Sequence, residues 1–225
     1  MNKFLSSFAY FFYPNRCVGC YEIIKSKYYF CFSCTFNLPK LPIVYGKNND
    51  VYSRLSSFEK IYAAYSYLLF SDKGIVKNLI HSIKYEGNIG LAEFVAKNFA
   101  KNIKNIVDAD CIIPVPLHPQ KRKKRGYNQS EIITRTMANV LNVESDITSL
   151  VRLKNTSTQT KKDAESRANN MKNAFKVVNR LGIENKKILL VDDVITTGAT
   201  ILECVKAITI FNPMKITVAS IAFAY

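Results

Sequence analysis

The sequence predicts an α/β fold, a doubly wound parallel sheet preceded by a small four-cysteine module. Short, continuous apolar runs, typical of strands covered on both faces, alternate along the chain with segments of helical period. Ahead of them lie two Cys-x-x-Cys pairs. We therefore expect the N-terminal segment and cysteine module to occupy residues 1–45 and the sheet domain to occupy residues 46–225.

The four N-terminal cysteines have the spacing of a metal site. Two CxxC pairs are separated by ten residues. Both thiolates of a pair on a tight turn can point at one ion, and two pairs complete a tetrahedral site. Because four thiolates leave no open coordination position, we expect a structural Zn²⁺ rather than a catalytic one. The expected ligands are Cys17, Cys20, Cys31 and Cys34. Cys111 and Cys204 fall in a predicted strand and helix and are expected in the core.

An apolar segment at residues 4–15 precedes the cysteines. It is too short to cross a bilayer, which takes about 20 apolar residues, so we expect no transmembrane segment. A helix that packs on the body or lies on a membrane surface is expected instead. The protein is then cytoplasmic, and peripheral at the inner membrane face if this segment binds lipid.

Strands and helices are expected in alternation after a polar linker at residues 38–50. The first helical pattern carries His81 at the edge of its apolar face, which favours packing or surface exposure over metal binding. The second carries Leu91, Phe94, Val95 and Phe99 on one face. Strands are predicted at 62–70, 110–119, 188–191 and 215–223, and helices at 73–87, from 88 onward, around 133–141, and at 201–208.

Two aspartates and a loop of small residues lie between the strand 188–191 and the helix that follows it. Backbone N–H groups of such a loop can bind an anion at the helix N-terminus. Asp192 and Asp193 suit sugar hydroxyls or a metal-bound water, because ligands of open α/β sheets bind at strand carboxyl ends. The combination describes a ribose 5-phosphate, with both carboxylates facing a solvent-filled crevice. The alternative is a plain strand–turn–helix whose aspartates only cap the helix.

The segment VDDVITTGAT resembles the PRPP loop of the type I phosphoribosyltransferases. The resemblance implies that the two aspartates meet the ribose hydroxyls and that Mg²⁺ accompanies PRPP. Purine-salvage members carry an aspartate at the position of Thr196, so the threonine argues against purine salvage. The residues implied to wrap the 5-phosphate are Thr196, Thr197, Gly198, Ala199 and Thr200.

The chain is strongly basic, with 32 Lys and Arg against 17 Asp and Glu and a formal charge of +15. Polyanions are therefore candidate partners, although an AT-rich genome also favours lysine. The densest run lies within PVPLHPQKRKKRGYNQSE. Its cations would neutralise pyrophosphate or a nucleic-acid backbone. The alternative is that they lie at the solvent-exposed start of a helix and bind no ligand. They are Lys121, Arg122, Lys123, Lys124 and Arg125.

Four separated motifs together strongly resemble the ComF family of competence proteins. They are the cysteine pairs, PVPLHP…KRGYNQS, TSTQTKKDAESRANNMKNAF and the PRPP-like loop. The resemblance implies a zinc knuckle joined to a phosphoribosyltransferase-type domain that serves DNA uptake. Lys162 departs from it, since the family usually has an apolar residue there. The residues implied on the pyrophosphate side and in a lid are Pro116, Leu117, His118, Arg125, Thr156, Gln159 and Arg167.

The function we favour combines PRPP binding with the handling of incoming single-stranded DNA in natural transformation. Lys121 to Lys124 would follow the DNA backbone, and aromatic residues near the knuckle would stack on bases. A competence helicase and other DNA-uptake proteins are the expected partners. The alternative is an active phosphoribosyltransferase of nucleotide metabolism with an unknown acceptor base, whose Mg²⁺ and cations hold the leaving pyrophosphate. A third reading is a scaffold that only retains the fold.

Overall fold

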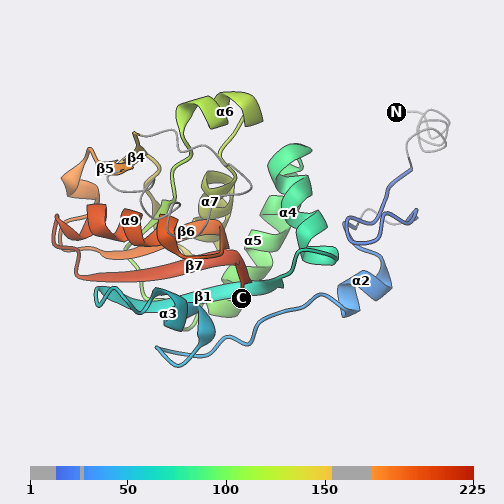
Figure 1. Ribbon diagram of the computed structural model, residues 1–225, viewed down its shortest axis with the longest axis horizontal. Coiled ribbons are helices and arrows are strands. Elements are labelled where there is room, and N and C mark those ends of the chain that lie inside the picture. Colours follow the sequence, from blue (N-terminus) through green and yellow to red (C-terminus); the bar gives the residue numbers. More distant parts are fainter. Residues whose placement is uncertain (1–13, 26–27, 154–173) are drawn as a thin grey trace.

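A parallel sheet of five strands forms the centre of the computed structural model, which describes residues 14–25, 28–153 and 174–225 (Figure 1). The strand order is β1–β7–β6–β2–β3, and every neighbouring pair is parallel. The predicted fold class is therefore confirmed. The strands are β1 (Ile61–Phe70), β2 (Cys111–Pro114), β3 (Glu144–Ser145), β6 (Lys187–Ile195) and β7 (Lys215–Ala224).

Helices cover both faces of the sheet, and each face has its own apolar cluster. This is why the central strands read as continuous apolar runs. The expected core cysteines, Cys111 and Cys204, are fully buried in one cluster. One face packs against α4 (Ile75–Tyr85), α5 (Ile89–Ile103) and α7 (Gln129–Leu141), and the other against α3 (Asp50–Leu55) and α9 (Ala199–Thr209).

The predicted helices and strands are confirmed in kind, but several details differ. The strand expected at 110–119 ends at Pro114, and Pro119 begins the helix α6 (Pro119–Arg125). Phe94, expected on the buried face of α5, is exposed and packs its ring against Tyr29 at 5.4 Å. The sequence pattern did not indicate α3, a short helix capped by the side chain of Asn49. The strand expected at 188–191 continues to Ile195, because its pairing with β7 runs on past both aspartates.

The expected linker is part of the sheet's edge. The amide of Leu41 donates to the carbonyl of Tyr67 at 2.9 Å, and the amide of Leu69 donates to the carbonyl of Pro39 at 2.8 Å. An antiparallel bridge joins Lys40 to Leu68. The segment therefore covers backbone groups of β1 that would otherwise be open to pairing with another chain.

Smaller elements complete the described chain. They are α2 (Phe32–Phe36), α6 (Pro119–Arg125), the antiparallel hairpin β4 (Leu150–Arg152) with β5 (Phe175–Val177), and a 3₁₀ turn at Arg180–Gly182. The lid residues Thr156, Gln159, Lys162 and Arg167 lie outside the described residues, as does most of the apolar N-terminal segment. Within the described ranges, no helix has the length and apolar character needed to span a membrane.

Candidate functional site

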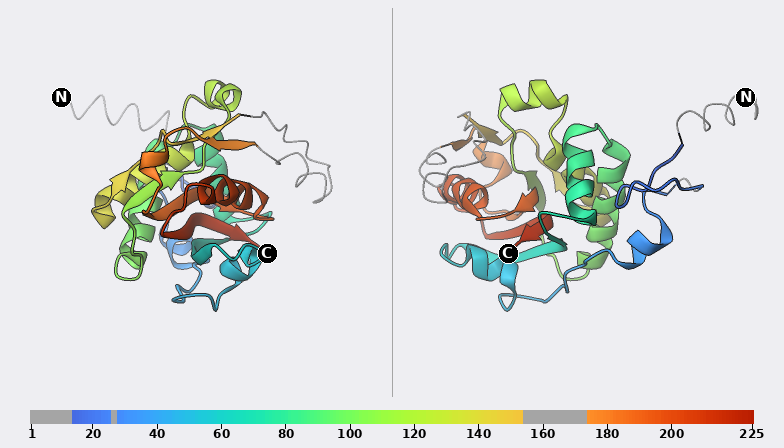
Figure 2. Two further views of the ribbon diagram at one scale, coloured as in Figure 1. Left: turned by 90° about the vertical axis from the view of Figure 1, so that its left-hand side faces the viewer. Right: turned by 45° about the vertical axis from the view of Figure 1, so that its right-hand side comes forward.

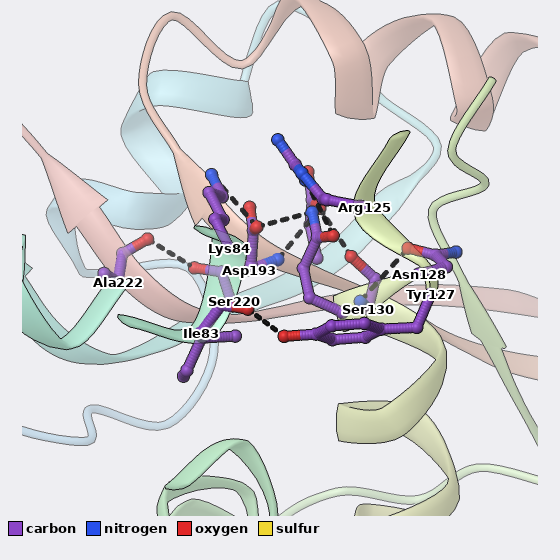
Figure 3. A network of polar contacts seen from close by, with 11 residues as sticks. Ile83, Lys84, Arg125, Tyr127, Asn128, Ser130, Asp193, Ser220 and Ala222 are labelled. Carbon is purple, nitrogen blue, oxygen red and sulfur yellow. Dashed lines mark hydrogen bonds and ion pairs between the residues drawn. The ribbon is translucent and has the colours of Figure 1, made fainter. Parts of the chain in front are cut away.

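The two aspartates lie near the C-terminal end of β6 and are buried, with 8% of Asp192 and 4% of Asp193 exposed. Ser130 Oγ donates to Asp192 Oδ1 at 3.0 Å, and Gln129 Nε2 donates to Asp193 Oδ2 at 2.7 Å. Both donors come from the first turn of α7, whose N-cap is the side chain of Asn128 (Figure 3). The expectation that the carboxylates face a solvent-filled crevice is wrong, because these side chains cover them.

Lys84, in the last turn of α4, forms an ion pair with Asp193 at 3.0 Å between Nζ and Oδ2. Both side chains are largely buried. On the other side, Arg125 Nη1 donates to Gln129 Oε1 at 2.8 Å. Arg125 is thus linked to Asp193 through Gln129, as the network in Figure 3 shows. Lys84 is a site residue that the sequence did not indicate, since a lysine at the end of an amphipathic helix is an ordinary feature.

Burial raises the pKa of Asp192 to about 7 from an ordinary value of 3.8, and the negative charge of Asp193 adds to this effect. The Lys84 charge and the hydrogen bond from Ser130 act in the opposite direction. The carboxyl group can therefore take up or release a proton near neutral pH.

The small-residue loop after β6 is held by α3. Arg54 Nη1 donates to the carbonyl of Thr196 at 2.6 Å. Gly198, at the N-cap of α9, has a φ of +79°. A Cβ at this position would lie 2.6 Å from Leu55 Cδ2, so glycine is required by both backbone conformation and space. Thr197 is exposed beside the first amides of α9, where an anion is favoured.

The loop after β2 reaches the same edge of the sheet, because Pro114 is paired with Val191 of β6. Asn128 Nδ2 donates to the carbonyl of Val115 at 3.2 Å and fixes the start of this loop. His118 accepts from the amide of Gln120 at 3.2 Å through Nδ1 and caps α6. The residues expected on the pyrophosphate side, Pro116, Leu117 and His118, are half-buried here.

Cations from α4, α6 and β4 gather near the carboxylates. Burial, followed by the charges of Arg152, Arg125 and Lys84, lowers the pKa of Lys121. Burial also lowers the pKa of Arg152, while the negative charge of Asp192 acts in the opposite direction. The Arg125 guanidinium lies 5.2 Å from the centre of the Tyr85 ring. We call Lys84, Lys121, Arg125 and Arg152 the inner cations.

The rest of the basic run lies away from this group. Arg122 pairs with Glu131 of α7 at 3.2 Å. Lys123 and Lys124 are exposed. The basic run, continuous in the sequence, therefore has two parts in the structure. Lys121 and Arg125 belong to the inner cations, and the other three residues lie on the outer side.

The four N-terminal cysteines are brought together. Their Sγ atoms all lie within 4.8 Å of one another, and Cys20 and Cys31 are 3.8 Å apart. A tetrahedral zinc ion with bonds of about 2.3 Å separates its sulfurs by about 3.8 Å. The cluster therefore has the donor atoms and the spacing of a zinc site.

The backbone around the cluster favours the thiolate of Cys17, whereas burial and the neighbouring cysteines raise the pKa of Cys34. Burial opposes ionisation of Cys17, but hydrogen bonds from the amides of Cys31, Cys20 and Gly19 prevail, and its pKa is lowered to about 7. The Cys31 amide lies 3.2 Å from Cys17 Sγ. A Cβ on Gly19 would lie 2.8 Å from Cys34 Sγ, so the first turn requires glycine.

Exposed aromatic side chains lie on the cysteine module. Phe32 and Phe36, four residues apart on α2, are 89% and 82% exposed. Tyr28 is exposed as well. Tyr29 instead packs on Phe94 of α5 and attaches the module to the sheet domain.

The chain is similar in sequence to proteins of known families. A phosphoribosyl transferase domain model matches residues 128–224, a range that includes both aspartates and the loop after β6. Competence protein F of Haemophilus influenzae is 33% identical over 132 residues, which are 58% of this chain and 58% of that protein. DNA utilization protein YhgH of Escherichia coli K12 is 30% identical over 131 residues, 56% of this chain and 57% of that protein. The chain thus spans less than two thirds of the length of these relatives.

Among solved structures, glutamine PRPP amidotransferase from B. subtilis, complexed with ADP and GMP, aligns with a TM-score of 0.42 at 16% identity. The alignment covers 62% of this chain and 30% of that one. Purine phosphoribosyltransferase from Pyrococcus horikoshii aligns with a TM-score of 0.36 at 14% identity and covers 62% and 75% of the two chains.

We predict one zinc ion per chain at the cysteine cluster. Metal analysis of freshly purified protein is expected to give about one equivalent, and Cys20→Ser is expected to lower it, because the site loses one of four ligands. Cys204→Ala, which removes a buried cysteine outside the cluster, is the matched control and is expected to keep the metal. Folded, metal-free protein with all four cysteines intact would contradict the assignment.

Asp192 makes stability fall as the pH rises from about 4 to about 7. Over this window the unfolded chain loses the proton while the folded chain keeps it, so ionisation favours unfolding; above it the effect is constant. Asp192→Asn keeps an acceptor for Ser130 and removes the effect. Chemical denaturation across this range measures it: the advantage of the variant should grow with pH, and an advantage independent of pH would refute the assignment.

Proposed function

We propose that this chain, which carries a phosphoribosyl transferase domain and is homologous to competence protein F, binds PRPP and handles single-stranded DNA during DNA uptake. The observation that carries the proposal is the pair of carboxylates near the C-terminal end of β6, which ends at Ile195 and is followed by a glycine-containing turn into α9. The names of the relatives, competence protein F and DNA utilization protein, favour DNA handling over the alternative of nucleotide synthesis.

The PRPP arrangement follows from the charges at the sheet edge. The 5-phosphate lies on the first amides of α9, where four backbone N–H groups lack partners within the helix. Asp192 and Asp193 accept hydrogen bonds from the ribose hydroxyls once the ligand displaces their present donors. The pyrophosphate, with its Mg²⁺, faces Lys121, Arg125 and Arg152 and the loop at residues 116–118, while Lys84 stays paired with Asp193. Mg²⁺ supplies charge neutralisation there, usually through its bound waters.

The DNA arrangement uses a different surface. Lys123 and Lys124 are exposed and can contact a phosphate backbone. They are not among the inner cations, so this contact leaves the positive charge around the PRPP site unchanged. The exposed rings of Phe32, Phe36 and Tyr28 offer faces on which unpaired bases can stack. Zinc serves this surface by fixing the turns that carry the rings.

The cellular setting completes the proposal. DNA arriving through the uptake machinery is met on the cytoplasmic side, at the inner membrane face. A competence helicase and other DNA-uptake proteins are then the partners, since they deliver the same strand.

Replacing both aspartates, Asp192→Asn with Asp193→Asn, is expected to weaken binding of PRPP–Mg²⁺ by a few kcal/mol. Hydrogen bonds to a charged group contribute about 1.5–3 kcal/mol each. Isothermal titration calorimetry measures the change. Asp108→Asn is the matched control, because this carboxylate pairs with Lys187 and Lys215 at the opposite end of the strands. Undiminished affinity in the double variant would show that the site is misassigned.

Lys123→Gln with Lys124→Gln is expected to weaken single-stranded DNA binding about equally for all sequences. The slope of log K against log salt should become shallower by about 0.7 for each phosphate that the variant no longer neutralises. PRPP affinity should not change. Lys97→Gln with Lys101→Gln removes the same charge from the exposed side of α5 and is expected to leave DNA binding near wild type.

Two outcomes of the DNA experiment would redirect the proposal. If both lysine pairs weaken DNA binding equally, only net charge matters and α6 is not the footprint. If the unmodified protein fails to bind DNA at low salt, direct DNA handling is refuted while the PRPP assignment stands.

A further inference from the structure

The helix α4 contacts both the cysteine module and the carboxylate pair. At its N-terminal end, Asn78 Nδ2 donates to the carbonyl of Gly19, between two of the cysteines, at 2.8 Å. Val76 and Leu79 belong to the same apolar cluster as Cys17 and Cys34. The module lies against the helix layer formed by α4 and α5, as the right-hand view in Figure 2 shows.

The C-terminal turn of α4 is fixed to the other site. Lys84 pairs with Asp193, and the carbonyl of the preceding residue, Ile83, accepts a hydrogen bond from the Tyr127 hydroxyl (Figure 3). Tyr127 directly precedes the N-cap of α7, so its contact joins α4 to the segment that carries Gln129 and Ser130, while Lys84 joins α4 to β6. Asn78 and Lys84 are six residues apart, which is about 9 Å along a helix.

We propose that α4 couples the metal centre to the PRPP site, with Lys84 as the positioning residue that holds Asp193 in register with the cysteine module. This inference rests on the proposed function. A buried carboxylate loses much of its compensation when its partner moves, and a packed helix transmits a displacement at one end to the other. No cysteine of the cluster needs to touch the ligand for the metal to affect its affinity.

A double-mutant cycle tests the route. The affinity for PRPP–Mg²⁺ is measured for wild type, Cys20→Ser, Lys84→Gln and the double variant. Cys20 is exposed, so its replacement removes a ligand with little loss of packing. We expect Cys20→Ser to weaken PRPP binding about tenfold, within the usual range of coupling between sites, and to have less than about a twofold effect when Lys84 is already replaced. Equal losses in both backgrounds, or no loss in either, overturn the proposal.

Further variants separate positioning from folding. Asn78→Ala removes the hydrogen bond to Gly19 but leaves the four cysteines, so about one zinc should remain while PRPP affinity falls severalfold. Lys84→Arg retains the positive charge and is expected to keep most of the PRPP affinity that Lys84→Gln loses. If the loss in Lys84→Gln came from packing alone, retaining the charge would not restore the affinity. Lys77→Gln, on the exposed side of the same helix, is the matched control and should behave as wild type. Wild-type affinity in Asn78→Ala overturns the proposal.

Hydrogen exchange provides a measurement that does not depend on PRPP. Removal of zinc by a chelator is expected to speed exchange in the last turn of α4, at residues 82–85, while the amides of α9 stay protected. Unchanged exchange in α4 overturns the coupling. If wild-type protein binds no PRPP but α4 responds to the metal, the proposed function fails and the coupling stands.

Discussion

The burial of two adjacent carboxylates at the end of a central strand is the constraint around which the site is organised. Such a pair is costly in a low-dielectric interior unless donors and cations surround it. Three elements supply them here: α7 with Ser130 and Gln129, α4 with Lys84, and α6 with Arg125 behind Gln129. The two of these helices that pack on the same face of the sheet, α4 and α7, thereby bring polar side chains to the same carboxylates. Their ends, rather than their apolar faces, define the chemistry of this edge.

The cysteine module is continuous with the sheet domain. Its buried residues join the apolar cluster of α4 and α5, and the segment that follows it pairs with the edge of β1. The contacts that join the module to this cluster are thus also contacts of α4, the helix that carries Lys84. The boundary expected at residues 45 and 46 remains a prediction about domains, while the packing across it is a feature of the fold.

The basic run illustrates how a tertiary environment gives different roles to similar neighbours. Lys121 is half-buried among other cations, Arg122 is paired with Glu131, and Lys123 and Lys124 are exposed. The helical turn of α6 causes this division, since consecutive residues point about 100° apart around a helix axis. One short helix can thus present cations to an anionic ligand at the sheet edge and to an anionic polymer on its outer side.

The sequence by itself determined the alternation of strands and helices, the cysteine cluster and the order of the aspartate pair and the small-residue loop. These are encoded in local periodicity and spacing, where neighbouring residues decide the outcome. Only the tertiary structure decided that the aspartates are buried, that Lys84 pairs with Asp193, and that Arg54 supports the loop at Thr196. Both of these pairings join residues that lie far apart in the sequence. Such pairs form because the packing of helices and strands brings their residues together. A local sequence pattern does not indicate which distant residue will become the partner.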